Sequence, residues 1–380
     1  MKNSLIIFGT RPELIKLIPI LLEIRKRGWE KHFKIIFTQQ HKDLIHDLLE
    51  RFNITPDHSL AISAHEKIGL TLSDIRRELQ LYITERPGET GFILAQGDTT
   101  SCFAAAMTAS ANQIPFAHVE AGLRTYDLNH PFPEEYFRQV ISQHAAVNFT
   151  PTKSATDNLL SENVSTDKIL QTGNTIVDMV EIWKNGTENE PSIAVQPFLK
   201  SNNVLITCHR RENQNSNFDC LIDSVIHLAN THVDLNFLWL CHPNPFVEEK
   251  LKHEKLKNTS NIYVLEPVHL FDMFALYRTS KVIITDSGGI QEEAISFNVP
   301  TLVIRKKTER QEALDSGNAK IVSVTDGTIQ SEFINSLNHP IENNTNPFGD
   351  GNAAIRIMDY FGNQLKISYQ APNLIQEENQ

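Results

Sequence analysis

Three acidic residues in the first half of the chain stand where an acid/base catalyst could act. Asp98 follows the segment "GFILAQG", Glu120 follows "IPFAHV", and Glu134 follows "PFP" at the start of an expected helix. Carboxylates held beside a substrate can take and return protons. Asp98 could instead cap the helix that begins "TTSCFAAAM", and Glu134 or its neighbour Glu135 could offset a helix dipole. Glu120 has no helix to cap and therefore needs another purpose.

Two basic residues stand just after an apolar run near the N-terminus, in "SLIIFGTRPELIK". Thr10 and Glu13 form a capping box, which predicts that a strand turns directly into a helix here. Arg11 and Lys16 then lie near a helix N-terminus, whose backbone N–H groups favour anions. This arrangement indicates an anion site, and the alternative is a solvated helix start with a surface ion pair. Pro19 predicts that the helix kinks or starts afresh.

The second half of the chain contains a turn suited to a phosphate group. In "TDSGGIQEEA", Ser287, Gly288 and Gly289 separate an apolar strand from a helix, so that bare backbone N–H groups can approach a phosphate. Glu292 and Glu293 follow, and one of them could accept hydrogen bonds from ribose hydroxyls. The alternative is a glycine-rich turn with two acids that suit the helix dipole. The patterns G-x-x-x-x-G-K-[ST] and G-x-G-x-x-G do not occur, so an ATPase or a nicotinamide dinucleotide fold has no fingerprint here.

Metal and redox chemistry receive little support from the sequence. His118 and Glu120 have the H-x-E spacing of zinc deaminases, but no P-C-x-x-C follows and H-E-x-x-H does not occur. Arg138, one turn after Glu134, offers the carboxylates a cationic partner. The cysteines show no C-x-x-C spacing, which predicts reduced structural thiols: Cys102, Cys208, Cys220 and Cys241. We therefore expect neither a metal nor a nicotinamide cofactor.

The elements that must position these residues alternate between strand and helix along the whole chain. This β-α-β order predicts an α/β protein with parallel doubly wound sheets. The polar segment 184–192 separates two such series and predicts two domains. In such sheets ligands lie outside the carboxyl ends of the strands, where five clusters fall: "GTRPE", "QGDTT", "HVEAG", "CHRREN" and "TDSGG". We therefore expect a ligand cleft between the domains.

Size and charge restrict the class of ligand. A chain of 380 residues fits two domains of about 150 to 200 residues each. The formal charge of −11 and the pI near 5.8 argue against general nucleic-acid binding and favour a small anionic metabolite held by local positive charge. The N-terminus does not resemble a signal peptide, and no apolar run approaches the length of a membrane span. We expect a soluble cytoplasmic protein without membrane insertion.

Eight clusters occur in the order "FGTRPELIKLIPI", "QGDTT", "HVEAGLRT", "PFPEE", "HRREN", "TDSGGIQEEA", "TERQEAL" and "NPFGDG". In this combination the chain resembles the non-hydrolysing UDP-N-acetylglucosamine 2-epimerases, over residues 4–362. The resemblance implies a GT-B-like fold of two doubly wound Rossmann-like domains facing a central cleft. It implies domains at residues 1–170 and 171–351, with a C-terminal helix within 352–380 that packs back on the first domain. It also implies a UDP-sugar substrate and a homodimer.

The resemblance further implies that UDP-GlcNAc and UDP-ManNAc are interconverted by elimination of UDP to 2-acetamidoglucal and its re-addition. The implied catalytic residues are Arg11, Lys16, Asp98, Glu120, Glu134 and His209. The implied substrate contacts are Arg11, Arg138, His209, Arg210, His242, Ser287, Gly288, Gly289, Glu293 and Arg310. The serine and the two glycines would hold the diphosphate, Glu293 the ribose and Arg310 the nucleotide end. We place Asp98 and Glu120 on one face of C2 and Glu134 on the other.

Departures from the family pattern bear on regulation and on the sugar. Many members bind a second, activating UDP-GlcNAc molecule, and the expected contacts here are Gln40, His41, Arg210 and His242. Asp43 stands where that set has a Gln, so allosteric activation stays open. Cys208, Tyr126 and Pro243 also depart from common residues and could reshape the sugar pocket to fit a further-modified UDP-sugar. A hydrolysing epimerase that releases ManNAc, a GT-B glycosyltransferase and a non-catalytic UDP-sugar sensor would each bind UDP as well.

Overall fold

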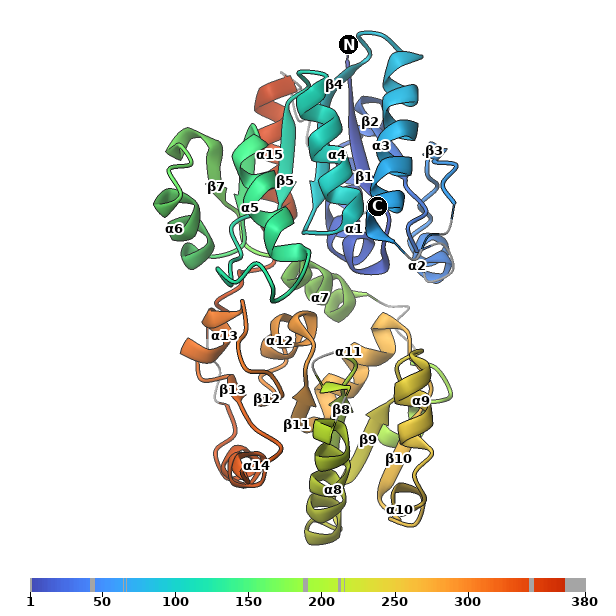
Figure 1. Cartoon of the computed structure of the whole chain (residues 1–380), viewed down its shortest axis with the longest axis vertical. Helices are drawn as coiled ribbons and strands as arrows, with labels where there is room; N and C mark the ends of the chain where they lie inside the picture. Colours follow the sequence, from blue (N-terminus) through green and yellow to red (C-terminus); the bar gives the residue numbers. More distant parts are fainter. Residues whose placement is uncertain are drawn as a thin grey trace, which may run out of the picture. The chain divides into compact units, whose positions relative to one another are not determined.

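The computed structural model describes residues 2–41, 45–63, 65, 67–186, 191–210, 213–214, 216–341 and 345–365, which form two compact units (Figure 1). Unit 1 comprises Met1–Met179 and Gly349–Gln380, and unit 2 comprises Val180–Phe348. The predicted first boundary follows residue 170, whereas in the structure the boundary falls within α7 (Thr175–Asn185). Residues 366–380 of the expected C-terminal segment lie outside the described residues.

Unit 1 contains a seven-stranded sheet in the order β3-β2-β1-β4-β5-β6-β7. Its strands are β1 (Asn3–Phe8), β2 (Phe33–Phe37), β3 (His58–Ser59), β4 (Thr90–Gln96), β5 (Phe116–Val119), β6 (Val147–Thr150) and β7 (Ile169–Gln171). Its helices are α1 (Arg11–Lys26), α2 (His46–Arg51), α3 (Ile68–Thr84), α4 (Thr100–Ala111), α5 (Glu134–His144), α6 (Lys153–Ser161), the first part of α7, and α15 (Ala353–Leu365), with short 3-10 turns at Glu30–His32 and Thr166–Lys168. All neighbouring strands are parallel, which confirms the predicted doubly wound sheet.

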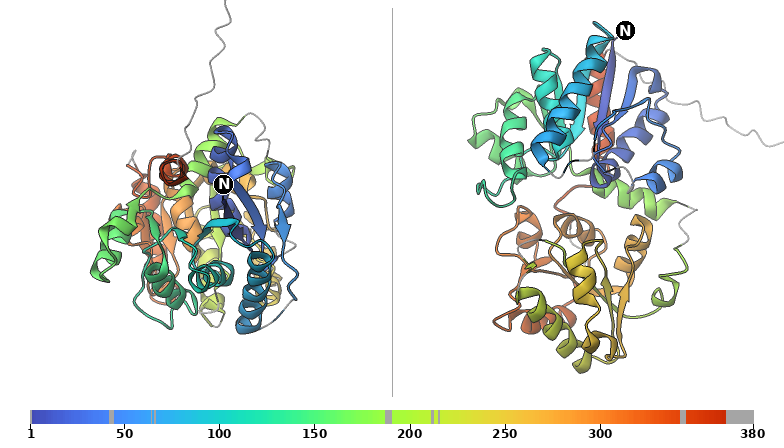
Figure 2. Two further views of the ribbon diagram at one scale, coloured as in Figure 1. Left: turned by 90° about the horizontal axis from the view of Figure 1, so that it is seen from above. Right: turned by 45° about the vertical axis from the view of Figure 1, so that its right-hand side comes forward.

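Helices cover both faces of this sheet (Figure 2). Leu5 and Ile7 alternate along β1 and share a buried cluster with α3, α4 and α5. Phe361 of α15 packs on the other face, where its ring centroid lies 5.8 Å from that of Phe33 and 5.2 Å from that of Phe92. A segment from the far end of the chain therefore completes the core of unit 1.

The first helix differs from one expectation. α1 is a single helix that contains Pro19, so of the two predicted alternatives the fresh start does not occur, and the kink stays a prediction. A proline inside a helix removes one N–H donor and strains one carbonyl contact. The apolar residues on both sides of Pro19 are buried, and their packing holds the helix together.

Unit 2 contains a six-stranded parallel sheet in the order β10-β9-β8-β11-β12-β13. Its strands are β8 (Asn203–Thr207), β9 (Asn236–Leu240), β10 (Ile262–Leu265), β11 (Ser280–Thr285), β12 (Thr301–Val303) and β13 (Ala319–Ile321). Its helices are the end of α7, α8 (Ser216–Thr231), α9 (Pro245–Leu251), α10 (Glu254–Lys257), α11 (Leu270–Thr279), α12 (Gly288–Ile295), α13 (Gln311–Asp315) and α14 (Thr328–Asn338), with a 3-10 turn at Gln196–Phe198. The predicted second doubly wound sheet is therefore confirmed.

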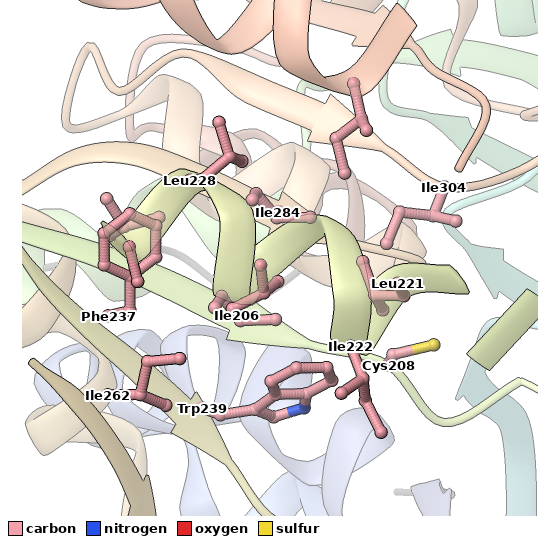
Figure 3. Packing of buried hydrophobic residues seen from close by; sticks show 14 of the residues in the cluster. Ile206, Cys208, Leu221, Ile222, Leu228, Phe237, Trp239, Ile262, Ile284 and Ile304 are labelled. Carbon is pink, nitrogen blue, oxygen red and sulfur yellow. The ribbon is translucent and has the colours of Figure 1, made fainter. Parts of the chain in front are cut away.

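The core of unit 2 lies between this sheet and its covering helices. Leu221 and Leu228 of α8 belong to the same buried cluster as Ile206 of β8 and Trp239 of β9 (Figure 3). Burying a side chain of this kind contributes about 1.5 to 3 kcal/mol. Cys208, just beyond the end of β8, belongs to the same cluster, so the core reaches the loop that carries His209.

The carboxyl ends of neighbouring strands carry several of the predicted functional residues in each unit. In unit 1, β1, β4 and β5 are adjacent, and in unit 2, β8 and β11 are adjacent. Parallel strands end at the same edge of a sheet, so the loops that follow them lie together. Within the described ranges, no helix combines the length and apolar character needed to cross a bilayer.

Candidate active site

The capping box predicted at the start of α1 is present and extends further than the sequence showed. Thr10 accepts the N–H of Glu13, while Glu13 Oε2 accepts the N–H groups of Thr10 at 2.8 Å and Gly9 at 3.0 Å. Glu13 Oε1 accepts the hydroxyl of Thr99 at 2.6 Å. Burial raises the pKa of Glu13 to about 7, although these hydrogen bonds oppose the rise. One buried carboxylate thus joins the loops that follow β1 and β4.

Lys16 and Glu120 form an ion pair beside the ends of β1 and β5. The Lys16 ammonium contacts Glu120 Oε2, and Gln96 Nε2 donates to the same oxygen at 2.8 Å. The side chains of Lys16 and Glu120 are only 9% and 7% exposed. Glu120 adopts a φ of 66°, in the left-handed region, where the chain leaves β5. Lys16 therefore has a protein carboxylate as a partner, which the interpretation of an anion at the helix N-terminus did not include.

Asp98 is held by an arginine and does not cap a helix. Arg138 Nε and Nη2 each lie 2.7 Å from Asp98 Oδ2. The cap of α4 is Thr99, whose side chain accepts the N–H of Cys102, so the capping interpretation of Asp98 is wrong. The Asp98 side chain is 28% exposed. It therefore stays accessible to a ligand while a buried cation fixes its position.

The acidic pair at the start of α5 is divided by burial. Glu135 is fully buried and accepts the N–H groups of Thr125 at 3.0 Å and Tyr126 at 3.1 Å. It also lies 3.3 Å from Arg138. Glu134 is half-buried and, by its i,i+4 spacing, lies on the same side of α5 as Arg138. The buried structural role therefore belongs to Glu135, and the catalytic role of Glu134 stays a prediction.

His118 supports the loop that carries Asp98. His118 Nε2 donates to the carbonyl of Gly97 at 2.7 Å. Burial lowers the pKa of His118 to about 4, so the ring is neutral at physiological pH. Across the described parts of the chain, no three His, Cys, Asp or Glu side chains are grouped to hold a metal ion. His118 is therefore a buried neutral histidine that supports the Asp98 loop, and the absence of a metal stays a prediction.

The expected allosteric contacts of unit 1 adjoin the start of α4 and the loop after β1. Gln40 Oε1 accepts the N–H of Ser101 at 3.1 Å and its hydroxyl at 2.7 Å. The His41 N–H donates to the carbonyl of Gly9 at 2.8 Å. The remaining two residues of this set belong to unit 2, and Asp43 lies outside the described residues. Allosteric activation stays a prediction.

The predicted phosphate turn of unit 2 presents backbone donors. Ser287 precedes α12, and its N–H donates to Thr285 Oγ1 at 3.0 Å. Gly288 and Gly289 form the first turn of α12, where N–H groups have no acceptor within the helix. A Cβ atom on Gly288 would lie 3.2 Å from Glu309 Oε1, which leaves little room for a larger residue. This geometry suits a phosphate group.

The two acids of α12 have different surroundings. Glu292 is fully buried, and Arg310 Nε donates to it at 2.8 Å. Arg310 also contacts Glu309, and its side chain is 8% exposed. Glu293 is half-buried and accepts the Tyr277 hydroxyl at 2.7 Å. Glu293 is therefore the more accessible acid, and the contacts of Glu293 with ribose and of Arg310 with the nucleotide stay predictions.

His209 and His242 stack with ring centroids 4.8 Å apart and an interplanar angle of 12°. His209 Nδ1 lies 3.2 Å from Asp286 Oδ1. Burial, reinforced by the neighbouring His209, lowers the pKa of His242. The His209 ring thus contacts the residue that directly precedes the phosphate turn, and β8 and β11 end at the same edge of the sheet.

Each unit contains an arginine with an unsatisfied donor at a predicted phosphate-binding position. Arg11 Nε and Arg210 Nε are buried and have no hydrogen-bond acceptor among the residues that the structure describes. A buried donor without an acceptor is costly, and an anionic ligand would satisfy it. Both arginines are therefore suited to bind phosphate oxygens.

Two residues that contact predicted catalytic groups were not predicted from the sequence. Gln96 donates to Glu120, and Asp286 accepts from the loop of His209. Gln96 belongs to the cluster "QGDTT" and is the last residue of β4, and Asp286 belongs to "TDSGG" and directly follows β11. Their position at the carboxyl ends of strands was the available signal.

The fold and the site together define a GT-B-like α/β protein with two doubly wound parallel sheets and charged residues at their strand ends. A family model described as UDP-N-acetylglucosamine 2-epimerase matches residues 23–362. The chain belongs to the UDP-N-acetylglucosamine 2-epimerase family, which confirms the resemblance found in its motifs.

Individual relatives match over nearly their full length. A UDP-N-acetylglucosamine 2-epimerase from Neisseria meningitidis serogroup A is 35% identical over 368 residues, which cover 93% of this chain and 98% of the relative. The crystal structure of UDP-GlcNAc 2-epimerase from Neisseria meningitidis bound to UDP-GlcNAc has a TM-score of 0.85 and 33% identity, over 94% of this chain and 99% of that one. The Methanocaldococcus jannaschii UDP-GlcNAc 2-epimerase in complex with UDP-GlcNAc and UDP has a TM-score of 0.82 and 31% identity, over 96% and 100%.

Proposed function

We propose that this chain catalyses the reversible C2 epimerisation of UDP-N-acetylglucosamine to UDP-N-acetylmannosamine without a nicotinamide or metal cofactor. The proposal depends mainly on the two ion-paired carboxylates of unit 1, Glu120 with Lys16 and Asp98 with Arg138. Full-length relatives that carry the name of this activity, and solved relatives with UDP-GlcNAc bound, support the choice of substrate.

The reaction needs acid/base groups because the C2 proton of an acetamido sugar is not next to a carbonyl. Loss of UDP from C1 makes its removal feasible. A carboxylate takes the proton, the C–H electrons form the C1–C2 double bond, and the C1–O bond breaks with its electrons on the diphosphate. UDP then adds again to C1 of 2-acetamidoglucal, and C2 receives a proton on the opposite face.

The carboxylates of unit 1 are proposed to act on the sugar. Asp98 and Glu120 work on one face of C2, and Glu134 works on the other. Lys16 holds Glu120 and offsets its negative charge, as the ion pair indicates. Arg11 is proposed to bind a phosphate oxygen through its buried Nε–H.

The residues of unit 2 are proposed to bind the nucleotide and its diphosphate. The N–H groups of Gly288 and Gly289 at the start of α12 accommodate phosphate oxygens, together with Ser287. His209 donates a proton to the departing diphosphate, and Glu293 accepts hydrogen bonds from the ribose. Arg210, His242 and Arg310 complete the proposed set of contacts.

Incubation with UDP-GlcNAc in deuterated water tests the proposal directly. We expect UDP-ManNAc to appear, with deuterium at C2 of both sugars, as followed by proton NMR. Glu120→Gln should lower C2 exchange by about 10²- to 10⁴-fold, because it removes an acid/base group. Glu85→Gln is the matched control and should keep full activity, because Glu85 is 67% exposed and pairs only with Arg86 among the contacts described for it.

The products of this incubation distinguish the competing functions. Release of free ManNAc would assign a hydrolysing epimerase, and sugar transfer to an added acceptor would assign a glycosyltransferase. Absence of both products and of C2 exchange would refute the proposal. Exchange on a further-modified UDP-sugar, with none on UDP-GlcNAc, would retain the chemistry and correct the substrate.

Two further features are part of the proposal. The family resemblance supports a homodimer, which light scattering coupled to size-exclusion chromatography tests. The four cysteines are free thiols, which supports a cytoplasmic location: Cys102, Cys208, Cys220 and Cys241. Fractionation of the source cells tests that location.

A further inference from the structure

Asp286, directly after β11, is a buried carboxylate surrounded by donors from the loop after β8. Its side chain is fully buried. Oδ2 accepts the N–H groups of His209 at 3.0 Å and Arg210 at 2.9 Å, and also Asn213 Nδ2 at 2.9 Å. A carboxylate with this many donors ties two neighbouring strand ends together.

Burial by itself would favour the neutral acid, but the donors decide the charge. Hydrogen bonds from His209, Arg210 and Asn213 hold the pKa of Asp286 well below its usual range, against the effect of burial. Asp286 is therefore ionised at physiological pH. Its negative charge is retained inside unit 2 beside an imidazole ring.

The imidazole of His209 meets this charge at a defined atom. Nδ1 lies 3.2 Å from Asp286 Oδ1, and the ring stacks on His242 at 4.8 Å. A carboxylate that accepts from one ring nitrogen keeps the proton there and leaves the other nitrogen for a ligand. The side chain of His209 is 33% exposed, so part of the ring is open to a ligand.

We propose that Asp286 is the positioning residue of His209: it accepts the Nδ1–H, fixes the tautomer and directs Nε2 to the diphosphate. This inference rests on the proposed function. As the C1–O bond breaks, the Nε2 proton passes to a diphosphate oxygen and the N–H electrons stay on Nε2. The proton returns to Nε2 when the C1–O bond forms again. Asp286 stays ionised throughout and offsets the charge of the imidazolium.

Cys208 adds a donor that is a departure from the family pattern. Its Sγ lies 3.3 Å from Asp286 Oδ2 and donates to it. The thiol therefore contributes a further weak hydrogen bond to the same carboxylate.

The tautomer of His209 tests the proposal without reference to turnover. Full-length protein labelled with ¹⁵N-histidine is studied by two-bond ¹H–¹⁵N NMR, and the His209 signal is assigned by its loss in His209→Gln. At a pH where the ring is neutral, we expect the form protonated on Nδ1. In Asp286→Asn we expect the form protonated on Nε2 to appear. A wild-type ring protonated only on Nε2 would overturn the proposal, even if Asp286→Asn does not fold.

Kinetics on UDP-GlcNAc provide the second readout. Asp286→Asn should lower kcat by about 10- to 100-fold, with little change in KM. In a His209→Gln background the same substitution should have almost no further effect, because Asp286 acts through His209. If the losses of kcat from the two substitutions multiply in the double variant, the proposal is overturned.

A matched control separates positioning from folding. Asp272→Asn alters another buried aspartate of unit 2, which accepts the N–H of Ser192 at 2.7 Å. It should reduce stability but leave kcat and the His209 tautomer unchanged. If wild-type protein shows no epimerisation, the proposed function fails, whereas the tautomer experiment still reports on the Asp286–His209 contact.

Discussion

Two glycines next to the predicted carboxylates provide a matched test of the backbone geometry. Gly122 follows β5 with a φ of +89°, and a Cβ atom there would lie 2.2 Å from the carbonyl oxygen of Ala155. Gly97 follows β4 with a φ of +81°, and nothing would lie within 4 Å of its Cβ atom. Gly122→Ala therefore adds backbone strain and a collision with backbone, whereas Gly97→Ala adds strain alone.

The expected cost follows from these two effects. A left-handed conformation costs a residue with a Cβ atom about 1 to 2 kcal/mol, which is the whole loss expected for Gly97→Ala. Forcing additional atoms into packed surroundings costs about 1 to 3 kcal/mol more. Since the Ala155 carbonyl belongs to the first turn of α6, Gly122→Ala must move that helix. We expect it to lose about 2 to 5 kcal/mol.

Urea denaturation followed by circular dichroism measures the free energy of unfolding of both variants. Hydrogen exchange with mass spectrometry locates the change, and peptides from unit 2 serve as the internal reference. Exchange should accelerate in β5 and α6 for Gly122→Ala. Equal losses in the two variants, or a loss below about 0.5 kcal/mol for Gly122→Ala, would refute the reasoning.

Three further predictions test the charged groups. Lys16→Met should lower the free energy of unfolding by about 3 kcal/mol, because it removes the Lys16 ammonium from the buried Glu120 carboxylate. Adding Glu120→Gln should restore most of the loss, and additive losses in this double-mutant cycle would contradict the ion pair. The pKa of Glu13 is about 7 in the folded protein, against an ordinary value of 4.5. Its contribution to the free energy of unfolding is therefore full below pH 4.5 and is lost as the pH rises through 7, a total change of about 3 kcal/mol. Glu13→Gln should flatten this part of the pH–stability curve, and an unchanged curve would show that Glu13 does not titrate there. Asp178 accepts the N–H groups of the first two residues of α15 at 2.8 and 3.2 Å. Asp178→Ala should therefore lower the free energy of unfolding by about 1 to 2 kcal/mol and accelerate hydrogen exchange in α15. Unchanged exchange in α15 would show that Asp178 does not cap this helix.

Local features were readable because their partners are close in the chain. The capping box of Thr10 and Glu13 and the glycine turn before α12 depend on residues within a few positions of each other. The alternation of strands and helices predicted both parallel sheets for the same reason. Eight ordered clusters led to the family, although allosteric activation, the sugar and the dimer stay predictions.

The roles of neighbouring acids could not be read in this way. Glu134 and Glu135 are adjacent acids in the same helix turn, but only Glu135 is buried under the loop of Thr125. Glu292 and Glu293 also differ in burial and partner, because Arg310 donates a hydrogen bond to Glu292. A helix turns its neighbouring residues to different sides, and burial on each side depends on what packs there.

The amino-acid sequence alone predicted the alternation of strands and helices, the charged motifs that follow the strands along the chain, and the family. These features follow from short-range patterns and from the order of the motifs. Only the tertiary structure decided that Lys16 meets Glu120, that Arg138 meets Asp98 and that Asp286 meets His209. These partners lie far apart in the chain. Their contacts exist because parallel strands that are adjacent in the sheet end at one edge, and the order of strands in a sheet is set by long-range packing.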